Sequence, residues 1–299
     1  MKFSVHVEND LEMLEEAIDS SCDRIRFGSE FCDAKMPSLS VLEKAFALTE
    51  GAEKDFAYVT PRVSESTLGE IHEQLNFLNK KRKIGVVVND FGILSILKRC
   101  HGLTPHLGRQ MIHVPARCPW LKTEIKDVVF SPLRTISRTK LVRSGEDIYS
   151  QTNLNYEPTI RFFKDLGVKG VDLDWIPKCF PHYDFIAKNG LDLSLHLHLV
   201  PVTITRKCHT ARFLGEKSPQ TCSKPCKTRA FLLERKEFNL QLFLHGNTVF
   251  SLVNPSRKDL ERSLRINVAE FVITMNPLTE ILDREKIDSL IGQVKAIIT

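Results

Sequence analysis

Three cysteines, Cys208, Cys222 and Cys226, stand close together in the segment RKCHTARFLGEKSPQTCSKPCKTRA. Prolines, charges and small polar residues replace the apolar periodicity of a packed helix or strand there, so we predict a loop over residues 203–230. Thiolates on a flexible backbone can converge on a soft metal. The C-x13-C-x3-C spacing supplies three ligands, whereas a tetrahedral zinc or a cubane iron–sulfur cluster needs four. A fourth ligand must therefore come from another part of the chain.

The rest of the 299-residue chain alternates short β-rich runs with amphipathic helical segments. Repeated about eight times, this pattern predicts an α/β fold, a TIM-like (β/α) barrel, formed by one domain over residues 1–299 that contains the cysteine loop. The β-rich runs lie at 3–7, 24–28, 55–60, 83–89, 106–109, 168–175, 191–202, 238–245, 247–253 and 270–275.

Cys32 is the preferred fourth ligand. It follows the second predicted strand by four residues, and Cys208 follows the 191–202 strand by six. Because the C-terminal ends of barrel strands share one rim, both thiols are expected there, and all four cysteines are expected to converge. Cys22 and Cys100 fit a buried core better.

Two further cysteines and one histidine stay open as ligands. Cys118 and Cys179 also favour the core, although both border proline turns, and Cys179 or His209 would replace Cys32 if it lay on the other face.

Two side chains are candidates for proton transfer. The run LDLSLHLHLVPV alternates, with leucines on one face and Asp192, Ser194, His196 and His198 on the other, so the polar face would point into the barrel with His198 nearest the rim. Asp174 ends the strand in VKGVDLDW. His198 and Asp174 could act as general acid or base, and the alternative is that both are structural.

The chain resembles the peptidase U-32 (collagenase-like) family, and within it the UbiV-type iron–sulfur proteins of oxygen-independent ubiquinone biosynthesis. The resemblance rests on the GSEFC run that ends at Cys32, on RKCHTAR with its downstream C-x3-C, and on LFLHGNTVFSLVNP at 242–255. It implies a [4Fe-4S] cluster held by Cys32, Cys208, Cys222 and Cys226. The residues by themselves suit zinc equally well. The segment 110–150 matches the family only loosely.

Peptidase chemistry is not expected. No cysteine follows His245 and Gly246, unlike in the peptidase-type members, and there is no G-x-S-x-G or H-E-x-x-H motif. The resemblance instead implies oxygen-independent hydroxylation of a small aromatic substrate, a quinone precursor or an RNA base, together with a homologous subunit as heterodimer partner. A non-catalytic accessory subunit with a structural or electron-transfer cluster and a structural zinc protein are the alternatives.

The composition sets the remaining expectations. The chain has no apolar run of signal-peptide or membrane length, so we expect a cytoplasmic protein without membrane insertion. Its eight cysteines in a domain of this size are not a disulfide scaffold. The formal charge of +5 permits an RNA or acidic partner without requiring one.

Overall fold

The computed structural model describes the chain except residues 82, 119–123, 131–135, 145–148, 216–221 and 299. Eight parallel strands close into a barrel, in the order β1-β14-β9-β8-β5-β4-β3-β2. The predicted (β/α) barrel is thereby confirmed. The strands are β1 (Lys2–Val7), β2 (Arg24–Gly28), β3 (Asp55–Val59), β4 (Ile84–Val88), β5 (Leu103–Leu107), β8 (Gly170–Asp174), β9 (Asp192–His196) and β14 (Val268–Thr274).

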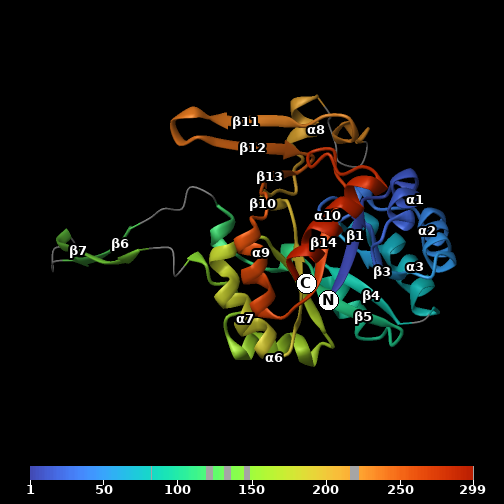
Figure 1. The fold of residues 1–299 in the computed structure, drawn as a ribbon, viewed down its shortest axis with the longest axis horizontal. Coiled ribbons are helices and arrows are strands. Elements are labelled where there is room, and N and C mark those ends of the chain that lie inside the picture. Colours follow the sequence, from blue (N-terminus) through green and yellow to red (C-terminus); the bar gives the residue numbers. More distant parts are fainter. Residues whose placement is uncertain (82, 119–123, 131–135, 145–148, 216–221, 299) are drawn as a thin grey trace.

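Amphipathic helices surround the barrel (Figure 1). Several begin at a side chain that caps the first turn: the Asp10 carboxylate accepts hydrogen bonds from the backbone N–H groups of Glu12 and Met13, and Ser38 and Asp90 cap later helices. Their apolar faces pack on the outer side of the strands. The helices are α1 (Leu11–Asp19), α2 (Leu39–Gly51), α3 (Leu68–Asn79), α4 (Phe91–Leu97), α6 (Glu157–Asp165), α7 (Phe180–Lys188), α9 (Arg257–Ser263) and α10 (Arg284–Ile298).

A four-stranded antiparallel sheet is inserted between β9 and β14, with the strand order β10-β13-β12-β11. It lies over one end of the barrel, together with the short helix α8 (Figure 1). Its elements are β10 (Leu199–Ile204), α8 (His209–Phe213), the 3-10 turn η6 (Pro225–Lys227), β11 (Phe231–Arg235), β12 (Leu240–His245) and β13 (Thr248–Leu252).

A second insertion follows β5. Two 3-10 turns, η3 (Arg109–Met111) and η4 (Pro115–Arg117), lead to an antiparallel hairpin of β6 (Glu124–Phe130) and β7 (Ile136–Ser144). The hairpin extends away from the barrel (Figure 1). Both of its strands lie within the 110–150 segment.

The interpretation of 191–202 as one strand is wrong. The run breaks at His198, whose φ of 70° is left-handed, so β9 stays in the barrel while β10 joins the inserted sheet. The runs 238–245 and 247–253 belong to that sheet too. Apolar alternation cannot separate these two destinations, because both sheets bury one face of each strand. The predicted loop over 203–230 also contains α8 and η6.

The core follows the barrel architecture. Val5, Ile25 and Phe271 are among the fully buried strand residues, and Leu14 and Ile71 are among the helix residues packed on the barrel. In the part of the chain that the structure describes, no helix is both long and apolar enough to span a membrane.

Candidate functional site

A small cavity lies at the C-terminal end of the barrel strands, where the inserted sheet covers the barrel. Its volume is about 30 Å³, which is close to the space needed by one water molecule. The lining side chains come from the ends of barrel strands, from the segments that follow them and from the β12–β13 hairpin. They include His6, Glu8, Cys32, Lys35, Arg109, His245, Asn247, Thr248 and Thr274. We call this region the mouth.

A partly buried ion pair lies at the mouth, which Cys32 also lines. The Nζ of Lys35 is 2.6 Å from Oε2 of Glu8. Burial alone would lower the pKa of Lys35, but Glu8 and the neighbouring thiols of Cys226 and Cys32 hold it above its ordinary value. Lys35 is therefore a fixed positive charge between two of the predicted ligands.

The cysteine segment is fastened to the mouth by polar contacts. Nε2 of His245 lies 2.6 Å from the carbonyl oxygen of Cys226, and Nδ2 of Asn247 donates to the carbonyl oxygen of Phe31 at 2.7 Å. A Cβ added to Gly246 would lie 3.7 Å from Sγ of Cys226. Residues 226 and 31–32, far apart in sequence, are thus held on the same side of the barrel.

The predicted ligands differ in their surroundings. Burial raises the pKa of Cys32 to about 12. Burial also raises the pKa of Cys226, and the neighbouring thiol of Cys208 raises it further. Cys208 is the N-cap of α8, and its Sγ accepts a hydrogen bond from the backbone N–H of Ala211 at 3.4 Å. Sγ of Cys222 accepts from the backbone N–H of Lys224 at 3.4 Å.

The structure brings Cys32, Cys208 and Cys226 into one neighbourhood, and Cys222 lies one short turn before Cys226. Among the described residues, however, no three His, Cys, Asp or Glu side chains are arranged to hold a metal ion. The donor set, thiols from two segments at one end of the barrel, has the chemistry of a thiolate-bound metal or cluster. The ligand set stays a prediction.

Three of the other four cysteines are buried, as predicted. Cys22, Cys100 and Cys179 are buried, and Cys179 packs beside Tyr183. Cys118 is half-buried in the segment after η4. His209 is the first residue of α8, with its ring near Phe213.

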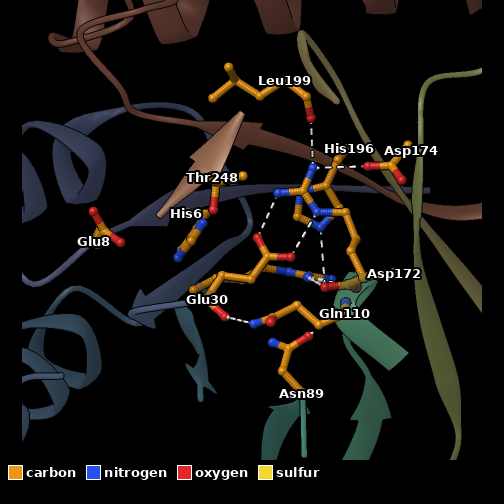
Figure 2. Close-up of polar contacts among 12 residues, drawn as sticks. His6, Glu8, Glu30, Asn89, Gln110, Asp172, Asp174, His196, Leu199 and Thr248 are labelled. Carbon is orange, nitrogen blue, oxygen red and sulfur yellow. Dashed lines mark hydrogen bonds and ion pairs between the residues drawn. The ribbon is translucent and has the colours of Figure 1, made fainter. Parts of the chain in front are cut away.

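Arg109 joins three segments at the mouth, and its partners Glu30, Asp174 and Leu199 are labelled in Figure 2. Its Nε and Nη2 atoms donate to the two carboxylate oxygens of Glu30 at 2.8 and 2.6 Å. Its Nη1 atom donates to Asp174 at 3.1 Å and to the carbonyl oxygen of Leu199 at 2.7 Å. One buried guanidinium therefore connects the segments after β2 and β5 with the end of β8 and the start of β10.

A second arginine occupies the barrel interior below it. Nη1 of Arg26 donates to both oxygens of Asp172 at 2.8 Å, and its Nη2 pairs with Glu270. His196 lies 3.1 Å from Asp172, and Ser194 donates to Glu270 at 3.0 Å. Burial, helped by Arg109, lowers the pKa of His196, so its imidazole is neutral near pH 7.

The two candidates for proton transfer do not line the mouth cavity. Asp174 is fully buried, and its carboxylate is occupied by Arg109 and by Nε of Arg117 at 2.5 Å. His198 lies at the break between β9 and β10 rather than inside the barrel, and its buried Nε2 has no hydrogen-bond partner in the described part of the chain. The prediction that His198 projects into the barrel is wrong, whereas that for Ser194 and His196 is confirmed.

Sequence reasoning missed the arginines that organise this end of the barrel. Arg26 alternates with apolar residues in RIRFG, which is a signal for a charge pointing into the lumen once a barrel is predicted. Arg109 and Lys35 lie in irregular segments after strands, where no periodicity marks them.

Comparison with known proteins does not identify a family for this chain. No family model and no curated protein matches the chain. A U32 peptidase structure is 10% identical over 92% of this chain and 93% of its own, with a TM-score of 0.44. Dihydropteroate synthase from Thermus thermophilus, in complex with 4-aminobenzoate, is 14% identical over 100% and 93%, with a TM-score of 0.44. Thiamine phosphate pyrophosphorylase from Pyrococcus furiosus is 7% identical over 100% and 97%, with a TM-score of 0.46. Such distant similarity says nothing of activity.

Proposed function

We propose that this protein is an iron–sulfur subunit in the oxygen-independent hydroxylation of an aromatic or heterocyclic compound, acting with a homologous partner subunit. The observation that carries the proposal is that Cys32 and Cys226 lie close enough to Lys35, and Cys208 close enough to Cys226, for their charges to interact at one end of the barrel. The motif resemblance to UbiV-type proteins supports iron over zinc and a quinone precursor or an RNA base as the compound.

Four thiolates would hold the cluster, those of Cys32, Cys208, Cys222 and Cys226, and it would supply one-electron redox chemistry. Lys35 would offset part of the negative charge of the thiolates, and Glu8 keeps the ammonium in place. The backbone contacts of His245 and Asn247 hold the two ligand-bearing segments against each other.

The geometry favours the accessory form of this function, in which the cluster transfers electrons or orders the loop. A cavity of about 30 Å³ has no room for an aromatic ring, and the carboxylate of Asp174 is held by two arginines. A ring could enter only after the inserted sheet had moved. The hydroxylation itself is therefore assigned to the partner subunit.

Metal analysis tests the cluster. Protein purified without oxygen should be brown, absorb broadly near 400 nm and contain iron and sulfide, because charge transfer from sulfur to iron absorbs visible light. Replacing any of the four cysteines with Ala should lower the iron content, whereas Cys22→Ala, a buried thiol just before β2 at the opposite end of the barrel, should not. Colourless protein that contains zinc would refute the proposal in favour of a structural zinc site.

A second experiment separates catalysis from an accessory role. His198→Ala and Asp174→Asn should leave the visible spectrum unchanged. In cells grown without oxygen, an accessory role predicts normal amounts of hydroxylated product by mass spectrometry. A loss of about 10²-fold or more would instead show that one of these residues transfers a proton in this chain.

A further inference from the structure

The cysteine segment carries the positive charge of the whole chain. Residues 203–230 contain seven Lys and Arg and one Asp or Glu, a formal charge of +6, whereas the complete chain carries +5. The rest of the protein is therefore close to neutral. A charge of this density on a segment of 28 residues attracts anionic surfaces over about a Debye length, roughly 8 Å at physiological salt.

The cations are available for a partner. None of the cations described in this segment is paired with a described acidic side chain within ion-pair distance. Five of them are exposed and Lys224 is half-buried. They are Arg206, Lys207, Arg212, Lys224, Lys227 and Arg229.

The cations surround the predicted ligands. Arg212 is on α8, which Cys208 caps, and Lys227 is in η6 next to Cys226. Helix α8 packs against η6 and β12, so these charges share one region on the inserted sheet (Figure 1). Phe213, 64% exposed on the same helix, adds an apolar contact point. We call this region the basic face.

We infer that the basic face docks an acidic electron-transfer protein, such as a ferredoxin, that exchanges electrons with the cluster. The inference rests on the proposed function and deepens it by naming a partner. One electron leaves the reduced centre of the docked protein and is taken up by the cluster, and no bond forms or breaks. Charged rims with small contact areas are typical of such transient complexes.

The observations favour a protein over RNA. Recognition of single-stranded RNA relies on several aromatic side chains on which bases stack. Phe213 is the one strongly exposed aromatic among the described residues of this segment, and its ring already packs edge to face on Phe231 at 5.5 Å. The mouth beneath the basic face also has no room for a base.

Binding of a strongly acidic plant-type ferredoxin tests the inference. The variant R212Q/K227Q/R229Q removes three charges from the basic face. The matched control K44Q/R161Q/K169Q removes three exposed charges from α2, from α6 and from the segment before β8. Affinity is measured at low and high salt, with both iron-loaded and metal-free protein, and a single-stranded RNA oligonucleotide is titrated in parallel.

We expect ferredoxin binding that weakens with salt and falls about tenfold or more in the basic-face variant but not in the control. Reduction of the loaded protein by ferredoxin should slow by a similar factor, with the iron content unchanged. Binding that is equal in both variants, or RNA bound more tightly than ferredoxin and lost in the basic-face variant, would overturn the inference. Zinc in place of iron would refute the proposed function and the electron transfer that depends on it, whereas the docking itself is tested separately on the metal-free protein.

Discussion

Removing the Arg109 guanidinium tests whether the buried ion-pair network sets the stability of the barrel mouth. Arg109 and Glu30 are each 1% exposed and form a two-point contact. In Arg109→Met, Asp174 keeps Arg117 as its partner, so the uncompensated buried charge is that of Glu30. Breaking one partner of such a pair costs about 3 to 5 kcal/mol. The free energy of unfolding should fall by that amount.

Urea unfolding measures this change. Arg257→Met is the control, because Arg257 pairs with Glu261 at 3.0 Å on the surface, where such a contact is worth about 0 to 1 kcal/mol. The double variant Arg109→Met/Glu30→Gln should lose less than the sum of the two single variants, since no charge of the pair is left alone.

The same variant has a second readout. Glu30 lies two residues before Cys32, and the Arg109 guanidinium lies 5.3 Å from the centre of the Phe31 ring. Arg109→Met should therefore also loosen the segment that carries Cys32 and lower metal retention. A loss of stability below about 1 kcal/mol, or strict additivity in the double variant, would contradict the assignment of Arg109 as the organising residue.

Three more predictions address the lumen, the opposite end of the barrel and the cluster. Burial alone would raise the pKa of Asp172, but Arg26 and His196 outweigh it and hold it far below its ordinary value. The stabilisation from ionised Asp172 is complete above the unfolded pKa of about 3.9 and is lost as the pH falls towards the folded pKa. Asp172→Asn should therefore lower the free energy of unfolding by a constant amount from pH 7 to 5. Below about pH 4 the difference from the unmodified protein should shrink, which urea unfolding at a series of pH values measures. At the N-terminal end of the strands a cavity of about 170 Å³ borders Gly85, where an added Cβ would meet Ala57 at 3.5 Å; Gly85→Ala should raise the melting temperature, corresponding to about 0.4 to 1 kcal/mol, and a lower one would contradict this. Air should bleach the absorbance near 400 nm and release iron, because a cluster on an exposed segment is open to oxygen; unchanged iron after prolonged aeration would argue against an exposed cluster.

The barrel could be predicted because each strand and helix carries its own local signal. Runs such as KIGVVVN are long and apolar enough to indicate buried parallel strands, and helices begin at capping residues such as Asp10. The break at His198 has no such signal. Its left-handed backbone is imposed by the two sheets on either side, where the backbone N–H of Val253 donates to the His198 carbonyl oxygen at 2.8 Å. Tertiary contacts therefore determine where β9 ends, which the alternation of apolar residues does not mark.

The candidate site could likewise be predicted only in part. Cys32 could be predicted to lie near the cysteine segment because both follow the C-terminal ends of strands. In a closed parallel barrel those ends share one rim. The role of Lys35 could not be predicted, because it depends on the ion pair with Glu8 and on the thiol of Cys226, which is distant in sequence. Asp174 shows the opposite error: a carboxylate at a strand end is typical of a catalytic acid or base, but two arginines already hold this one. A strand end supplies a position on the rim, and only the partners that reach that position decide whether the side chain there binds, reacts or holds the barrel together.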